Sequence, residues 1–278
     1  MKVDQIAINS VSVKGNLPEM LPAFRKAGFR RVEFSLWQVR EYLSGGGAPA
    51  GARKLLDDNG LVCAGGFEHA LECFSDAGSR GKNLDRIAAS AELLAALGGS
   101  VLVVGTDGPA RPCDDPVGPI AEALAAAAGR IEQYGVSPIL EFNWSPVVKS
   151  LRTAVEAALR SGNPRVGVLF DTAHYHCTPT KPDQINAQSV PLIRHVHLND
   201  MRDKPGELSN CNSDRVLPGQ GCLDLKEIIG TLDKNGYSGL CAIELFNDEL
   251  WAMPPERAAR LMYESLLPFC GVICGVRA

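Results

Sequence analysis

Short apolar runs alternate with longer amphipathic stretches along the chain. Eight runs rich in β-branched or apolar residues have the length and composition of buried strands. They lie at residues 5–13, 31–36, 61–67, 100–104, 138–142, 166–170, 194–198 and 240–245. Strands that are apolar on both faces are typical of a parallel sheet covered by helices. The pattern therefore predicts a parallel sheet at the centre of the fold.

Helical stretches separate these runs. The first is introduced by Asn16, which is suited to an N-cap, and by an acidic first turn at Glu19, and it ends at Gly28. The alanine-rich stretch 120–134 consists of strong helix formers, so a helix is expected there rather than disorder. The remaining predicted helices are 53–59, 84–97, 148–160, 184–192, 225–234 and 255–267.

Eight strand–helix units follow one another without a linker rich in Pro, Gly and Ser, which predicts an α/β fold. We expect residues 1–278 to form one domain, a single (β/α)₈ TIM barrel. A doubly wound dinucleotide fold uses the same alternation, but it requires G-x-G-x-x-G directly after the first strand. Here Gly15 stands alone at that place, and the cluster Gly45–Gly47 follows a polar stretch. These glycines are interpreted as turn residues.

Chemically active side chains stand at the ends of four successive predicted strands. They are Glu141, Asp171, His197 and Glu244. One acid or histidine at a strand end is commonly a structural group, but four in succession indicate a site. In a barrel these strand ends are neighbours on one rim, so an O,O,O,N set for one divalent metal ion is expected. Without a thiolate, Mn²⁺, Mg²⁺ or Co²⁺ is favoured over Zn²⁺, although the general affinity order admits Zn²⁺ too.

Other histidines lie close to this set. His195 is two residues before His197 on the same strand face, and we expect it beneath the metal. His174 follows Asp171 by three residues and is expected at the height of a substrate.

Composition narrows the classes of partner. Hydrophobic residues make up 45% and charged residues 22% of the chain, and the net charge of −4 without a basic cluster argues against nucleic acid. No apolar run reaches the roughly 18 residues of a spanning helix, so no membrane partner is expected. The nine cysteines are scattered without Cys-x-x-Cys, which favours reduced thiols and a cytoplasmic location. The oligomeric state is left open, with a homo-oligomer compatible with the sequence.

Four ordered motifs carry a resemblance to a known family. They are Leu-Phe-Asp-Thr-Ala-His at 169–174, His-Val-His-Leu-Asn-Asp at 195–200, Asp-Arg-Val-Leu-Pro-Gly-Gln-Gly at 214–221 and Ile-Glu-Leu-Phe-Asn-Asp at 243–248. The set resembles the xylose isomerase-like TIM barrel superfamily, whose members isomerise, epimerise or dehydrate small polyhydroxylated ketones with a metal ion.

Resemblance to its ketose 3-epimerase branch implies roles for six residues. Glu141 and Glu244 are implied to be metal ligands and the catalytic acid/base pair. Asp171 and His197 are implied to complete the ligand set. His174 and Arg215 are implied to hold substrate oxygens, with Mn²⁺ as the expected ion.

Three departures qualify this resemblance. Val216 replaces a histidine that the related apurinic endonucleases need for three metals, which argues against phosphodiester cleavage. The stretch Asn143–Val147 lacks the further acid that is usual in the epimerase branch. The ending Glu-Leu-Phe-Asn-Asp at 244–248 is similar to dehydroshikimate dehydratases.

The chemistry shared by these enzymes begins with removal of a proton next to a ketone. A metal on the carbonyl and the adjacent hydroxyl stabilises the enediolate, and two carboxylates on opposite sides permit epimerisation or isomerisation. The expected function is a metal-dependent isomerase or epimerase of a small neutral sugar or keto-polyol. The alternative is a lyase, a dehydratase of inosose or dehydroshikimate type. A sugar-binding module without catalytic activity is the non-enzymatic alternative.

The segment Asn199–Cys222 is far longer than a usual connection between strand and helix. It leads through a polar run into Arg215 and a turn rich in Pro and Gly. We expect it to fold over the metal as a substrate cover, and a disordered insertion is the alternative.

Overall fold

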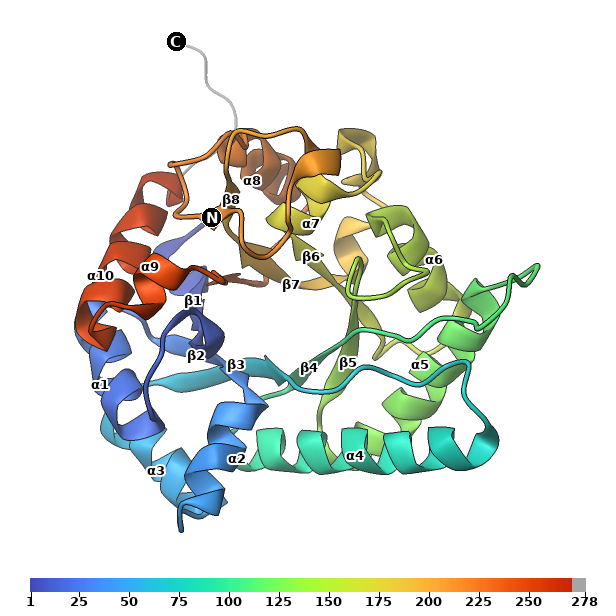
Figure 1. Ribbon diagram of the computed structural model, residues 1–278, viewed down its shortest axis with the longest axis horizontal. Helices are drawn as coiled ribbons and strands as arrows, with labels where there is room; N and C mark the ends of the chain where they lie inside the picture. The colour runs from blue at the N-terminus through green and yellow to red at the C-terminus, as the bar shows by residue number, and fades with distance from the viewer. Residues whose placement is uncertain (272–278) are drawn as a thin grey trace.

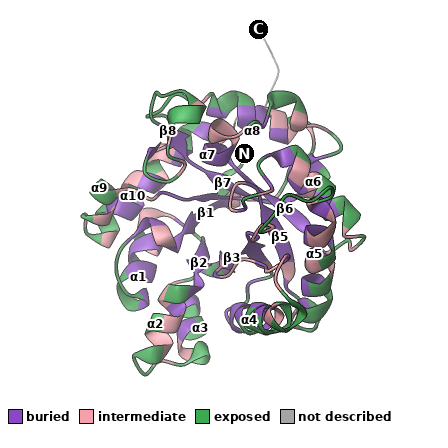
Figure 2. Ribbon diagram, turned by 45° about the vertical axis from the view of Figure 1, so that its right-hand side comes forward, coloured by how far each residue is buried: buried purple, intermediate pink, exposed green. Residues whose placement is uncertain are grey.

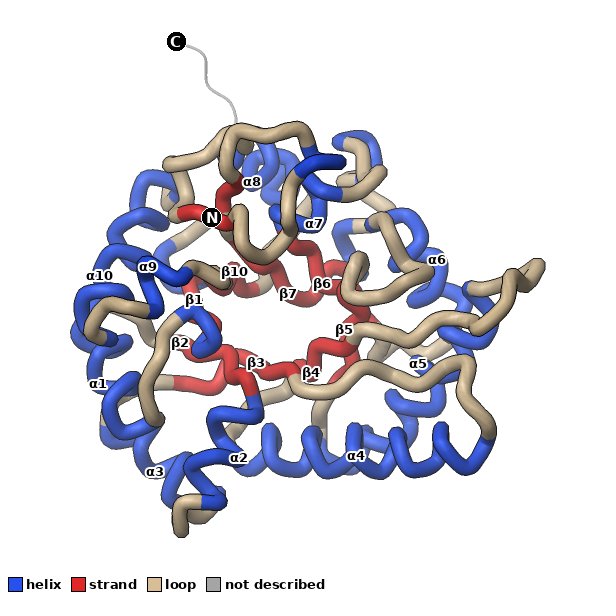
Figure 3. Tube along the Cα trace, in the orientation of Figure 1, coloured by secondary structure: helices blue, strands red, loops and turns tan. Residues whose placement is uncertain are grey.

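Eight parallel strands close into a barrel in the computed structural model, which describes residues 1–271 (Figure 3). Their order around the barrel is β1-β10-β7-β6-β5-β4-β3-β2, so the first strand pairs with the last. The strands are β1 Ile6–Asn9, β2 Arg31–Ser35, β3 Val62–Phe67, β4 Val101–Val104, β5 Ser137–Glu141, β6 Gly167–Asp171, β7 Ile193–Leu198 and β10 Leu240–Ile243. The predicted (β/α)₈ barrel is confirmed.

Helices surround this barrel (Figure 1). They are α1 Leu17–Ala27, α2 Leu36–Ser44, α3 Pro49–Asp58, α4 Ala77–Ala96, α5 Val117–Ile131, α6 Leu151–Arg160, α7 Thr172–Cys177, α8 Leu225–Lys234, α9 Asp248–Trp251 and α10 Pro255–Leu266. The predicted start of the first helix is confirmed, because Asn16 and Glu19 form a reciprocal capping box. Gly28 follows α1 with φ of 121°, a backbone conformation that favours glycine.

Two predictions about local structure are wrong. The expected helix 184–192 is replaced by two 3₁₀ turns, Pro182–Gln184 and Val190–Leu192. Pro191 would clash with the preceding turn of an α-helix, and the Asn186 side chain accepts from the amides of Gln188 and Ser189 instead. The first strand ends at Asn9 rather than at Val13, because the Asn9 side chain accepts from the Val11 amide and turns the chain.

The apolar faces of the helices pack on the outside of the strands, and their outer faces are exposed (Figure 2). The barrel interior contains two separate apolar clusters, one of larger side chains and one of alanines. Val103, Ile139 and Leu169 form an apolar cluster of their own on β4, β5 and β6. A second separate cluster consists of three alanines on β1, β3 and β10: Ala7, Ala64 and Ala242. The polar site described below stands at the end of this interior.

The segment 199–222 is built around a two-stranded antiparallel ribbon of β8 (Asp200–Met201) and β9 (Arg215–Val216). The Asp200 carboxylate is buried and accepts from the backbone amides of Gly219, Gly221 and Leu223. These bonds tie the end of the segment back to its beginning. The segment 199–222 therefore contains an ordered ribbon, and the alternative of a disordered insertion does not apply to it.

Within residues 1–271, no helix is both long enough and apolar enough to cross a membrane. The eight cysteines of this part of the chain are free thiols, three of them buried and five at intermediate or exposed positions. Cys274 lies outside the described residues.

Candidate metal centre

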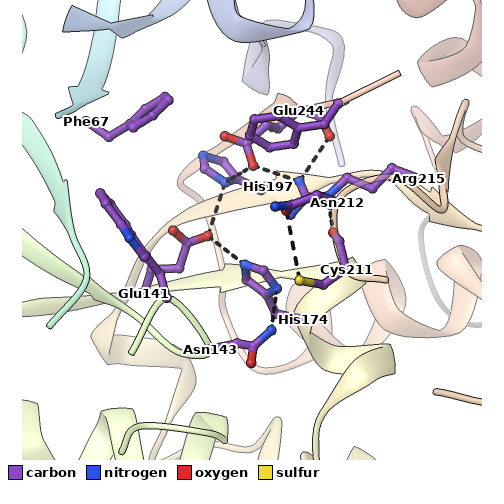
Figure 4. A pocket seen from close by; sticks show the side chains of 11 residues that line it. Phe67, Glu141, Asn143, His174, His197, Cys211, Asn212, Arg215 and Glu244 are labelled. Carbon is purple, nitrogen blue, oxygen red and sulfur yellow. Dashed lines mark hydrogen bonds and ion pairs between the residues drawn. The ribbon is translucent and has the colours of Figure 1, made fainter. Parts of the chain in front are cut away.

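Four side chains converge at the carboxyl ends of β5, β6, β7 and β10. Figure 4 shows three of them, Glu141, His197 and Glu244. Glu141, Asp171, His197 and Glu244 each offer one ligand atom, all four atoms lie within 4.8 Å of one another, and all four residues are buried. His197 Nδ1 is 3.1 Å from Glu244 Oε2, 3.6 Å from Glu141 Oε1 and 3.6 Å from Asp171 Oδ2. The structure thus brings together the four residues suggested by the sequence, and their role as ligands stays a prediction.

The donor atoms themselves fit a metal ion. Asp171 Oδ2 and His197 Nδ1 are buried and make no hydrogen bond among the described residues, although Arg215 Nη2 lies 3.1 Å from Asp171 Oδ2 and Glu244 Oε2 lies 3.1 Å from His197 Nδ1. Buried polar atoms that make no hydrogen bond are uncommon and require an explanation. Both atoms belong to the group of four, and three carboxylates with one imidazole suit a divalent ion.

Neighbouring groups fix the orientation of two of these carboxylates. Asp171 Oδ1 accepts from the amides of Ala173 (2.7 Å) and His174 (3.1 Å), so this residue caps α7 with one oxygen and faces the cluster with the other. Asn9 Nδ2 donates to Glu244 Oε1 at 2.9 Å. The ends of β6 and β10 therefore present preoriented oxygens.

Glu33, on β2, was not singled out from the sequence. Its Oε2 accepts from His197 Nε2 at 2.8 Å and from His195 Nε2 at 3.1 Å. Burial raises the pKa of this carboxyl, but His197 and His195 outweigh that effect and hold it well below its usual range. The one available sequence signal was a charged residue inside the run Val32–Phe34. His195 lies in this second buried group and not in the group of four ligand atoms.

His174 joins the cluster to the loop after β5. Its Nε2 is 3.4 Å from Glu141 Oε1, and its Nδ1 is 3.1 Å from the Asn143 side-chain amide. Asn143 adopts a left-handed backbone with φ of 72°. Burial lowers the pKa of His174, but the charge of Asp171, a hydrogen bond to Cys211 and the contact with Glu141 raise it to about 10.

Arg215, which was expected to contact substrate, also contacts the carboxylates of Glu244 and Asp171 directly. Only 1% of it is exposed. Its Nη1 donates to Glu244 Oε2 at 2.7 Å, and its Nη2 is 3.1 Å from Asp171 Oδ2. Its Nε donates to the Cys211 carbonyl at 2.6 Å, and the Phe246 ring lies 5.2 Å from the guanidinium. The β8–β9 ribbon therefore places the positive charge of Arg215 beside two of the four candidate ligands, Glu244 and Asp171.

A pocket of about 210 Å³ opens above the cluster. Its polar lining includes both glutamates, both histidines and Arg215, and its apolar lining is aromatic. The residues around it are Phe67, Glu141, Asn143, Trp144, His174, His197, Cys211, Asn212, Arg215, Glu244 and Phe246. Cys211 and Asn212 come from the segment 199–222, so part of the predicted cover does line the pocket. Aromatic walls with a few convergent polar groups suit a small polar ring or chain.

The chain is similar in sequence to known proteins. Inosose isomerase of Bacillus velezensis is 30% identical over 148 residues, which cover 52% of this chain and 52% of that protein. The chain thus matches about half the length of that relative. The 3-dehydroshikimate dehydratase of Pseudomonas aeruginosa is 28% identical over 273 residues, covering 95% of this chain and 41% of that protein.

The fold is shared with solved structures too. A crystal structure of the IOLI protein with a bound zinc atom superposes with a TM-score of 0.87 at 21% identity, covering 98% of this chain and 100% of that one. A sequence model described as xylose isomerase-like TIM barrel matches residues 21–267, which is most of the chain. The eight-stranded barrel, the buried cluster at its rim and this match together show that the chain belongs to the xylose isomerase-like TIM barrel family.

Proposed function

We propose that this protein is a divalent-metal-dependent isomerase or epimerase of a small, neutral polyhydroxylated ketone. The observation that carries the proposal is the placement of two buried glutamates, Glu141 on β5 and Glu244 directly after β10, around one centre beneath an aromatic pocket. A sugar-binding module without activity has no need for two carboxylates and a metal-type donor set in one place.

The residues divide the chemistry between them. Glu141, Asp171, His197 and Glu244 would hold the ion, with Mn²⁺ the first candidate and Mg²⁺, Co²⁺ and Zn²⁺ as alternatives. When bound, the ion supplies Lewis acidity that stabilises negative charge on the substrate's oxygens.

Proton transfer falls to the glutamates. One of the pair Glu141 and Glu244 takes the proton from the carbon next to the ketone, and the other returns a proton. Return to the opposite face of the same carbon is epimerisation, and return to the neighbouring carbon is isomerisation. Both carboxylates are buried, which limits competition from bulk water.

His174 and Arg215 are proposed to position the substrate. Both line the pocket, and each carries N–H groups that can donate to hydroxyl or carbonyl oxygens. The Arg215 guanidinium is held at its base by the Cys211 and Glu244 carbonyls, so its direction is set by the backbone. A fixed fork of this kind favours one orientation of a bound polyol.

Dehydration is the second candidate, because the similarity to a 3-dehydroshikimate dehydratase runs along 95% of this chain, whereas that to the inosose isomerase covers 52%. The first proton transfer is the same in both reactions. In the dehydratase a hydroxyl on the next carbon then leaves as water with a proton from the enzyme. The two candidates therefore share a site and differ in the fate of the deprotonated ketone.

Incubation of the Mn²⁺-supplied protein with ketoses, inososes and dehydroshikimate in deuterated water, followed by NMR, tests the proposal. An isomerase or epimerase should incorporate deuterium next to the ketone and produce an isomer of equal mass apart from the label. Loss of water would select the dehydratase. Absence of exchange with every compound, at ligand concentrations that bind, would overturn both, and undiminished ligand affinity in EDTA would point to a binding module.

A further inference from the structure

We propose that Glu33 is a positioning residue that fixes His197 with Nε2 protonated and Nδ1 turned toward the candidate metal. This inference rests on the proposed metal site and concerns a residue outside the four candidate ligands. Glu33 is fully buried on β2, and β1 and β10 separate β2 from β7, which carries His197. Its side chain therefore reaches across the inside of the barrel to the histidine.

The hydrogen bond determines which nitrogen carries a proton. A carboxylate only accepts hydrogen bonds, so the 2.8 Å contact of Glu33 Oε2 requires a proton on His197 Nε2. The opposite nitrogen, Nδ1, has no hydrogen-bond partner among the described residues and lies 3.1 Å from Glu244 Oε2. A neutral imidazole held in this way presents its lone pair at Nδ1, which is the form that a metal ion binds.

His195 holds the carboxylate in place. It donates from Nε2 to the same oxygen, Glu33 Oε2, at 3.1 Å, and the two imidazole rings lie at 84° to each other. The other oxygen, Oε1, lacks a partner within residues 1–271. Both imidazole N–H groups thus donate to one carboxylate oxygen, although the second oxygen is free to accept a hydrogen bond. The arrangement does not maximise the number of hydrogen bonds that the carboxylate makes.

Fold stability alone gives little reason for this residue. A buried ionic cluster is commonly no more stabilising than apolar side chains of similar volume, because removing the charges from water costs several kcal/mol. A carboxylate behind a metal-binding imidazole, in contrast, sets the ring orientation and increases the basicity of the ligand. The geometry therefore assigns Glu33 to the metal site rather than to the core.

Calorimetric titration of the full-length protein with Mn²⁺ tests this role. Glu33→Gln keeps the shape of the side chain, but its uncharged amide oxygen is a weaker acceptor for the two imidazole N–H groups than the carboxylate oxygen that accepts both of them. We expect the Kd for Mn²⁺ to rise about 10- to 100-fold. Glu68→Gln is the matched control, since Glu68 is also buried but pairs with Arg40 and Ser90. Its Kd should stay within about threefold of the parent value.

A spectroscopic measurement on the unmodified sequence decides the matter even if the variant fails to fold. In protein with ¹⁵N-labelled histidine and diamagnetic Zn²⁺, His197 should show a protonated Nε2 and a metal-bound Nδ1. Metal bound through Nε2, or an unchanged Mn²⁺ affinity in a folded Glu33→Gln variant, would overturn the role of Glu33 while leaving the proposed function intact. Failure of the unmodified protein to bind any of the four candidate ions would overturn both.

Discussion

Replacing Arg215 with methionine should destabilise the protein by an amount that depends on metal. Methionine keeps much of the side-chain volume and removes the charge. In the structure, that charge contacts Glu244 and Asp171, and all three residues are buried. The variant without metal therefore retains two buried carboxylates that have lost their principal cation.

The magnitude follows from what each condition leaves unpaired. In EDTA, removing one member of a buried charge pair costs about 3–5 kcal/mol of unfolding free energy. With saturating Mn²⁺, the ion compensates the carboxylates, and the remaining loss is that of the bonds from Arg215 to the Cys211 and Glu244 carbonyls, about 1–2 kcal/mol. The penalty should thus be about 1–4 kcal/mol smaller with metal than without it.

Urea denaturation followed by circular dichroism, in EDTA and in Mn²⁺, measures both penalties. Arg86→Met is the control, because Arg86 pairs with Glu72 on the surface, and its loss should cost about 0–1 kcal/mol in either condition. Equal penalties for Arg215→Met in the two conditions would refute the reasoning, since they would show that Arg215 does not balance the carboxylates.

Three further results are expected. Glu244→Gln should slow exchange of the substrate's C–H proton by about 10²–10⁴-fold while raising the substrate Kd less than Arg215→Ala does; equal losses of affinity would contradict a base and a positioning fork. Deleting 207–213 should raise KM and increase deuterium wash-in relative to product, since Cys211 and Asn212 line the pocket; unchanged values would make the segment a spacer. In EDTA, unfolding free energy should fall as pH rises from about 6.5 to about 10, because His174 has its pKa raised in the folded state, and His174→Gln should flatten that slope in urea titrations.

The barrel was predictable because each strand carries its own local signal. A run such as 100–104 is apolar on both faces and stands between helical stretches, which is enough to place it in a covered parallel sheet. Helix α2 was missed, because Leu36 was assigned to the preceding strand and the helix begins directly after Ser35. Such direct junctions leave no turn signal in the sequence.

The site was predictable only where chemistry coincides with a strand end. Glu141 and Asp171 end apolar runs, so topology alone suggests that they meet. Glu33 and Asn9 contact the cluster from β2 and β1, and no spacing rule links them to His197 or Glu244. Their roles depend on which residues face each other across the closed barrel, and that relation appears only in three dimensions.

The site can form only after β10 has been synthesised and has closed the barrel. Three of the candidate ligands lie on the consecutive strands β5, β6 and β7, but Glu244 directly follows the last strand, which pairs with both β7 and β1. During synthesis, a chain that has not yet reached Glu244 lacks both that carboxylate and the pairing of the two ends. An ion that needs all four donors therefore binds the finished barrel and not its precursors. Metal would then retain the folded product after synthesis rather than guide the nascent chain toward it.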